Sequence, residues 1–249
     1  RGDLVAVTKA ILLDYEARSL ELTDNVSYGK QKEPIVRYMA LLRAMDAKSQ
    51  LPLSDLSLYS YPASQLDNFP PAESRYRYNY TDMQLGQTPF NAPSVFNWFI
   101  PDFQPGGAIS SAGLYAPEFQ ITTESSVIQV ANYHYSISFN SNGQGGTPLP
   151  GATNGVDDNI QIDIADLANV WIAATGTEEQ RDAALVDQLD AIMTAGKLKA
   201  RYENAPLPNP RDSIIEMLTF LSTSSGGIRS KVQHGIYLLA TSPEYITQK

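Results

Sequence analysis

The sequence predicts a mainly α-helical fold: an irregular multi-helix domain with long proline- and tyrosine-rich loops and at most short strands. Apolar residues recur every three or four positions in several segments, as they do on one face of a helix. Prolines stand where several of these segments begin. Two stretches show no such period and are rich in turn-forming residues.

The 249 residues are enough for a substantial core, and 43% of them are hydrophobic. We therefore expect a single helical domain over residues 1–249. Within it, residues 50–86 are expected to form a loop insertion and residues 140–160 a Gly/Asp-rich loop.

Two helices are expected before the first loop. Asp3 can accept hydrogen bonds from the first turn of a helix whose apolar face includes Leu4 and Val7. Pro34 suits the first position of a second helix, which should end near Lys48.

The loop insertion contains the alternating segment RYRYNY at residues 75–80. If this segment is a short strand, Tyr76, Tyr78 and Tyr80 lie on one face, and Arg75 and Arg77 lie on the other. Such a face can bind a sugar polymer or a neighbouring subunit. Alternatively, the tyrosines pack on the core while the arginines face water. We favour the packing interpretation, and these five residues are kept as candidate binding residues.

The central stretch, residues 87–139, combines an aromatic loop with an apolar helix. Trp98 belongs to a proline-rich segment whose large rings must be covered. Pro117 is expected to open a long helix that is apolar on two faces, with Val127 on one of them, and such a helix is normally buried. Glu118 would be stabilised by the helix dipole and would tie the aromatic loop to the helix. Trp98 and Glu118 are therefore further candidate binding residues.

Acidic residues crowd the end of the second loop. Asp157, Asp158 and Asp163 offer the oxygen ligands that calcium takes, although the spacing of a calcium-binding EF-hand loop is absent. Helix capping and solvation explain the same residues, because a helical stripe follows at once. Capping and solvation are the simpler explanation, so no metal or cofactor is predicted, and calcium is kept as the alternative.

Four helices are expected in the last third of the chain. Thr177 and Gln180 form a capping box at the start of one helix, and Gly196 is expected to end it. A short helix over 197–203 follows, and Asn209 with Pro210 starts another. The last helix is expected over about 229–241, after a loop from Ser222 to Gly227.

No complete catalytic motif is present, so no catalytic residue is predicted. The chain has two histidines, and neither a nucleophile elbow nor a phosphate-binding glycine loop. His134 is expected to be a hydrogen-bonded core histidine, and His234 to lie at the surface or between helices. Glu118 and Glu124 are six positions apart and so would point about 240° apart around a helix.

Composition excludes several classes of protein. A net charge of −9 argues against nucleic-acid binding, which depends on Lys and Arg at phosphates. Without cysteine there can be no disulfide, thiolate nucleophile or cysteine-ligated metal. No apolar run approaches the length of about 18 residues that a membrane-spanning helix needs.

Several long motifs resemble the C-terminal half of a bacterial family known as domain of unknown function 1800. They are ILLDYEAR (11–18), SVFNWFIPDFQPGG with AGLYAPEFQITTESSV, LDAIMTAGKL (189–198) and LLATSPEYITQ (238–248). The resemblance implies an exported or envelope-associated protein, here the C-terminal part of a longer one. It also implies a partner in the envelope, either another protein or the N-terminal half that precedes such sequences.

Together these observations lead us to expect a non-catalytic helical scaffold in the periplasm or outside the cell. It would contact a partner protein or an extracellular polymer through its tyrosine-rich loops. The alternative is a hydrolase of an exported polysaccharide or ester with Glu118 as general acid or base and His134 near it. A 16-residue separation along one helix, about 24 Å by rise, opposes a shared site.

Overall fold

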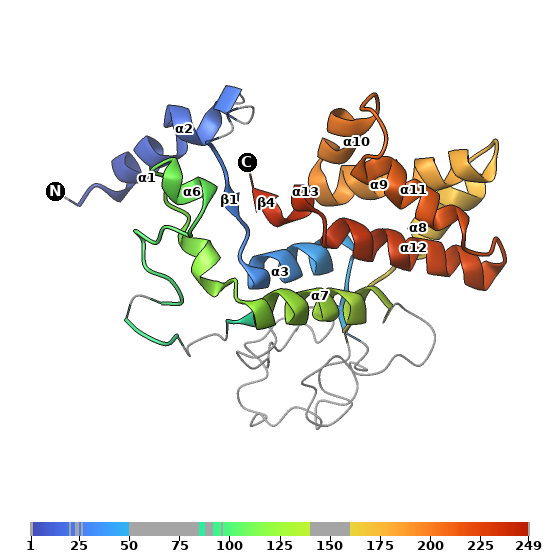
Figure 1. The fold of residues 1–249 in the computed structure, drawn as a ribbon, viewed down its shortest axis with the longest axis horizontal. Coiled ribbons are helices and arrows are strands. Elements are labelled where there is room, and N and C mark those ends of the chain that lie inside the picture. The colour runs from blue at the N-terminus through green and yellow to red at the C-terminus, as the bar shows by residue number, and fades with distance from the viewer. Residues whose placement is uncertain are drawn as a thin grey trace.

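The computed structural model has the mainly helical fold that the sequence predicts (Figure 1). It describes residues 2–19, 21–22, 25, 27–49, 85–87, 92–95, 97–139 and 160–248. Strands are confined, in this part of the chain, to two short antiparallel pairs. One pair joins β1 (Lys30–Gln31) to β4 (Thr247–Gln248), and the other joins β2 (Lys48–Ser49) to β3 (Ile160–Gln161).

The described helices begin at Leu4 and end at Ile246. In chain order they are α1 (Leu4–Leu12), α2 (Tyr15–Arg18), α3 (Pro34–Ala44), α6 (Ala108–Ser111), the 3-10 helix η4 (Pro117–Ile121), α7 (Glu124–Phe139), α8 (Ala165–Ala173), α9 (Glu178–Thr194), α10 (Lys197–Tyr202), α11 (Pro210–Thr219), α12 (Ser225–Ala240) and α13 (Pro243–Ile246). No described helix combines the length and the apolar character that crossing a bilayer requires.

Most helix starts lie where the capping residues predict them. Asp3 accepts hydrogen bonds from the first turn of α1, and Asn209 does the same for α11. The capping box of Thr177 and Gln180 is present in full at the start of α9. Near its end Ala195 and Gly196 both adopt left-handed backbone angles, which close the helix as expected.

The start of the last long helix was predicted too late. Ser224 accepts a hydrogen bond from the N–H of Gly227, so α12 begins at Ser225 and includes two glycines assigned to a loop. A Cβ on Gly227 would lie 2.0 Å from the carbonyl oxygen of Ser222. Glycine is therefore required there by close packing of the backbone rather than by a turn.

The core is centred on α9, which packs against α3, α8, α10, α11, α12 and α13. Leu185 and Leu189 of α9 are completely or almost completely buried. On α12, Gly235 allows close approach of the two helices, because a Cβ there would lie 2.7 Å from Leu189 Cδ1. Figure 1 shows α8 to α12 gathered together, with α3 and α7 beside them.

A fully buried lysine joins three of these helices. Lys231 of α12 donates to Asp182 Oδ2 of α9 at 2.9 Å and to the carbonyl oxygen of Leu218. Glu178 also lies 3.0 Å from the ammonium group. Trp171 of α8 donates its indole N–H to Asp182 Oδ1 at 2.7 Å. Each buried charge in this cluster is thus paired, as burial requires.

The expectation of one long, enclosed helix beginning at Pro117 was wrong in two respects. Residues 117–121 form the separate 3-10 helix η4, and Ser126 and Thr123 exchange hydrogen bonds at the start of α7. Only one face of α7 is buried. Val130 and Ile137 are buried, whereas Val127 is 55% exposed. The helix covers one side of the core instead of running through it.

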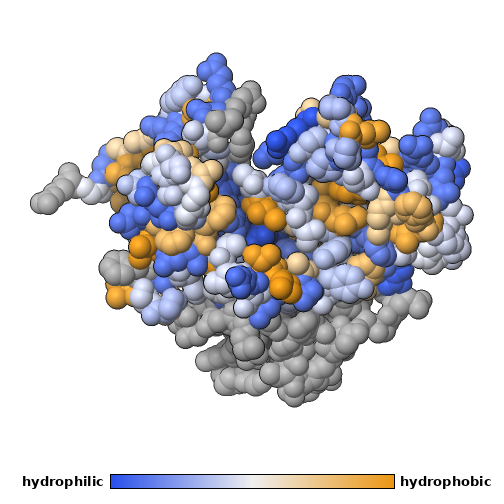
Figure 2. Space-filling model, viewed as in Figure 1, coloured by the Kyte–Doolittle hydropathy of each residue, from blue (hydrophilic) through white to orange (hydrophobic). Residues whose placement is uncertain are grey.

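The first helix keeps an uncovered apolar face. Leu4, Val7 and Ile11 of α1 are all more than half exposed, and no residue of α1 is buried. Figure 1 places α1 and α2 away from α8 to α12. Elsewhere on the visible surface, hydrophobic residues alternate with hydrophilic ones and gather in small patches (Figure 2).

Candidate functional site

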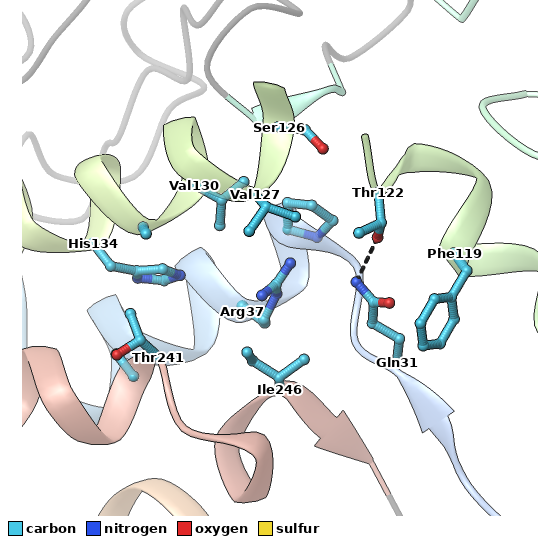
Figure 3. Close-up of a pocket in the computed structure, with 13 residues that line it drawn as sticks. Gln31, Arg37, Phe119, Thr122, Ser126, Val127, Val130, His134, Thr241 and Ile246 are labelled. Carbon is cyan, nitrogen blue, oxygen red and sulfur yellow. Dashed lines mark hydrogen bonds between the residues drawn. The ribbon is translucent and has the colours of Figure 1, made fainter. Parts of the chain in front are cut away.

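A cavity of about 290 Å³ lies where α3, α7 and the C-terminal segment meet (Figure 3). It collects residues from both ends of the chain and from its centre. The described residues that line it are Gln31, Pro34, Arg37, Phe119, Thr122, Ser126, Val127, Val130, Ala131, His134, Ala240, Thr241 and Ile246. Its volume is near the lower end of the range of small-molecule pockets.

Pairing of β1 with β4 brings the walls of the cavity together. Lys32 donates its backbone N–H to the carbonyl oxygen of Ile246 at 2.8 Å. This bond holds Gln31 and Ile246 next to the same cavity. Tyr245 is buried and donates its hydroxyl to the carbonyl oxygen of Arg37 at 2.5 Å. Burial raises the pKa of Tyr245, so this hydroxyl remains a donor.

Arg37 is a buried cation with no carboxylate partner among the described residues. It is 7% exposed, and its Nε has no hydrogen-bond partner. Glu33, one turn earlier, accepts a hydrogen bond from Gln87, and Glu244 accepts one from Tyr202. Burial lowers the pKa of Arg37, which nevertheless stays charged at neutral pH. An unpaired buried charge is costly, so it indicates a site for an anion.

His134 of α7 supplies the second polar group. It is 1% exposed, as expected for a core histidine, but the expected hydrogen bond is missing: neither ring nitrogen has a partner. Burial, reinforced by the charge of Arg37, lowers the pKa of His134 to about 3. The neutral ring therefore offers one N–H donor and one acceptor. Figure 3 shows its ring turned toward Arg37.

Among the described lining residues, three carry a hydroxyl group, and one of these has a hydrogen to donate. Ser126 donates to the carbonyl oxygen of Ile121, and Thr241 donates to that of Tyr237. Thr122 instead accepts a hydrogen bond from Gln31 at 2.8 Å (Figure 3), which leaves its own hydrogen available.

Further positive charge lies near the cavity. Lys32 Nζ is 4.3 Å from the centre of the Tyr245 ring. Burial lowers the pKa of Lys32, and the charges of Lys197 and Arg37 lower it further. Three cations therefore influence one region of a chain whose net charge is −9. This local excess of positive charge favours an anionic ligand.

Most residues selected from the sequence lie outside the described part of the chain: Arg75, Tyr76, Arg77, Tyr78, Tyr80, Asp157 and Asp158. The proposals for an aromatic face and for calcium stay untested there. Asp163 accepts a hydrogen bond from the N–H of Ala165 at 3.0 Å, close to the start of α8. Across the described residues, no group of three or more His, Asp or Glu side chains is placed to hold a metal ion.

Trp98 and Glu118 are described but do not line the cavity. Trp98 is half-buried, and its indole N–H has no hydrogen-bond partner. The aromatic loop contacts η4, because the N–H of Ile100 donates to Gln120 Oε1 at 2.8 Å. Glu118 is buried and lies 3.8 Å from Lys30 Nζ, so it joins η4 to β1 rather than to the aromatic loop.

One feature of the sequence points to Arg37 as a functional residue, although helical periodicity alone does not explain it. Arg37 lies three residues after Pro34 and four before Leu41, both of which are buried on the same face of α3. A charged residue at an apolar position of a helical stripe is an exception that calls for a partner. The residues that surround Arg37 cannot be identified from sequence spacing, because the other walls of the cavity come from residues 119–134 and 240–246.

In a comparison with family models, the model described as "Protein of unknown function (DUF1800)" matches residues 1–247. Neither the curated proteins nor the solved structures contain a match to the chain.

Proposed function

We propose that this chain, which belongs to the DUF1800 family of proteins of unknown function, is a binding protein that captures an anionic group in the Arg37 cavity. The single observation that carries the proposal is the buried guanidinium without a carboxylate among the described residues. A folded chain keeps such a charge at a cost to stability, and a bound anion would remove that cost.

The groups around Arg37 support binding rather than turnover. His134 has no described carboxylate to orient it, and its low pKa makes it a poor base near neutral pH. The hydrolase alternative paired His134 with Glu118, but Glu118 contacts Lys30 and is not part of the cavity wall. We therefore favour the non-catalytic role.

We further propose that the protein is exported and that the anionic group belongs to an envelope partner, an extracellular polymer or a small molecule that it presents. The family motifs motivate the location, and the cavity motivates the chemistry of the contact. Cell fractionation of the native host protein tests the location independently of the cavity.

Thermal unfolding with a panel of anions tests the proposal. Acetate, hexanoate, benzoate, sulfate and phosphate are compared at constant ionic strength, so that general screening is the same in each sample. A ligand at a hundred times its Kd stabilises the folded state by about 2.7 kcal/mol, which for a chain of this size raises Tm by roughly 5–10 °C.

The variants decide whether a shift arises at the cavity. Arg37→Met should lose the response, whereas Arg43→Met, on the exposed side of the same helix, should keep it. If no anion in the panel raises Tm of the wild-type chain, or if Arg37→Met responds as the wild type does, the proposed function is wrong.

A further inference from the structure

We infer that the ligand of the cavity is a monocarboxylate with a compact apolar body, rather than a phosphate ester. The inference rests on the proposed anion-binding function and specifies its ligand class. It follows from three independent properties of the described wall: its charge, its hydrogen-bond donors and its apolar surface.

The charge of the wall matches a single negative charge. Arg37 is the only charged side chain among the described lining residues. Lys32 is not part of that wall, and the charges of Lys197 and Arg37 lower its pKa. A carboxylate would neutralise the buried guanidinium, whereas a phosphate monoester carries about −1.5 to −2 at neutral pH and would bring uncompensated charge into the cavity.

The hydrogen-bond donors of the wall also match the two oxygen atoms of a carboxylate better than the three or four oxygen atoms of a phosphate group. The guanidinium of Arg37 is a planar fork that suits a carboxylate. Thr122 has a hydroxyl hydrogen to give, and His134 has one N–H. Ser126 and Thr241 already donate to backbone carbonyls, so they add no donors. Phosphate-binding sites usually add several backbone N–H groups, as at the N-terminus of a long helix.

The rest of the wall is apolar. Pro34, Phe119, Val127, Val130 and Ile246 line it, and Figure 3 shows Val127, Val130 and Ile246 close to Arg37. An inorganic anion would leave these surfaces unfilled, whereas a short branched or aromatic chain would cover them. The combination of one charged end and an apolar body is that of a small organic acid or of a terminal carboxylate on an apolar side chain.

Isothermal titration of the wild-type chain with matched probes tests the inference. Isovalerate and benzoate are compared with isovaleramide and benzamide, which keep the shape and lose the charge. Phenyl phosphate and inorganic phosphate supply the other anion class. We expect both carboxylates to bind at least tenfold more tightly than their amides and than either phosphate.

Three variants locate the binding. Arg37→Lys keeps the charge but loses the planar fork, and we expect it to weaken carboxylate binding about tenfold. Ala131→Leu fills the cavity from α7 and should weaken benzoate more than acetate. Arg43→Met is the matched control and should bind as the wild type does. Arg37→Lys and Ala131→Leu keep the test valid if Arg37→Met fails to fold.

The outcomes separate the two proposals. If phenyl phosphate or inorganic phosphate binds more tightly than the carboxylates, and Arg37→Lys weakens it, the anion site stands and the carboxylate assignment is wrong. If the amides bind as tightly as the acids, the carboxylate assignment is also wrong, because charge recognition is absent. If none of the anions binds, both proposals are wrong.

Discussion

Arg37 and Arg211 are both buried arginines, but the structure gives a carboxylate partner only to Arg211. The guanidinium of Arg211 donates to Asp187 Oδ1 from Nε at 3.0 Å and from Nη2 at 2.8 Å. Arg37 has no such contact with a described residue. The two residues therefore allow a direct test of what a buried arginine contributes to stability.

We predict opposite effects of replacing these arginines by methionine. Arg37→Met removes a buried charge that has no carboxylate partner among the described residues, so the free energy of unfolding without ligand should stay the same or rise by about 1 kcal/mol. Arg211→Met leaves Asp187 with one partner fewer, so it should lower the free energy of unfolding by about 1–3 kcal/mol. Urea denaturation measures both. If Arg37→Met lowered the free energy of unfolding as much as Arg211→Met does, Arg37 would serve to stabilise the fold and not to bind an anion.

His134 predicts a dependence of stability on pH. In the unfolded chain its pKa is near 6.5, and in the folded chain it is about 3. Below pH 6.5 the unfolded state therefore binds a proton that the folded state does not, so stability falls as pH decreases toward 3. The slope from this group approaches, at most, about 1.4 kcal/mol per pH unit.

Urea denaturation between pH 7.5 and 4.5 measures this slope. His134→Gln should reduce the fall in unfolding free energy over that range, because it removes the proton that only the unfolded state binds. His234→Gln is the matched control and should keep the wild-type curve, since His134 is still present. Equal slopes in wild type and His134→Gln would contradict the prediction.

Among the elements, α9 and α12 depend on each other through a close crossing. Gly235→Ala would place a methyl group 2.7 Å from Leu189 Cδ1, which forces a side chain or a helix to move. We predict a loss of about 1–3 kcal/mol in unfolding free energy by urea denaturation.

Gly226→Ala on the same helix is the control, because its Cβ would meet nothing within 4 Å. It should raise stability by up to about 1 kcal/mol through helix propensity. If both alanine variants had the same effect, the crossing would not be as close as the structure indicates.

The contact of α8, α9 and α12 around Lys231 should be equally sensitive. Lys231→Met would leave Asp182 buried, with the indole of Trp171 as a partner but without a cation. We predict a loss of about 3–5 kcal/mol. The double variant Lys231→Met with Asp182→Leu removes both charges and should recover part of that loss in the same denaturation assay. No recovery would mean that packing, rather than charge pairing, dominates here.

At the scale of the whole molecule, α1 and α2 contribute little to the described core. Neither helix contains a buried residue. A chain that starts at residue 19 should therefore keep the unfolding free energy within about 1 kcal/mol and should still bind the anion, as calorimetry can show. A large loss of either property would mean that the exposed apolar face of α1 packs on another part of the chain.

The helical fold could be predicted from the sequence because its signals are local. The capping box at Thr177, the Asn209–Pro210 start and the helical stripes each lie within a few residues. The break between η4 and α7 could not be predicted, because Ser126 and Thr123 cap α7 at a point where the apolar pattern continues. Local pattern also did not show that one face of α7 stays uncovered, since that depends on distant neighbours.

The candidate site was less predictable for the same reason. His134 was expected to be buried, but its lack of partners depends on residues of α3 and the C-terminal segment. Arg37 was visible only as a charge on an apolar stripe. Three separate parts of the chain must meet before either residue acquires its environment.

The pairing of β1 with β4 also sets the order in which the site can form. Ile246 follows Gln31 by more than two hundred positions, and both border the same cavity. During synthesis, α3 and α7 leave the ribosome long before the segment that closes the space between them. Until that segment arrives, the cavity lacks the part of its wall that Ala240, Thr241 and Ile246 supply. An acid that binds there would therefore recognise only chains in which α13 has already been added.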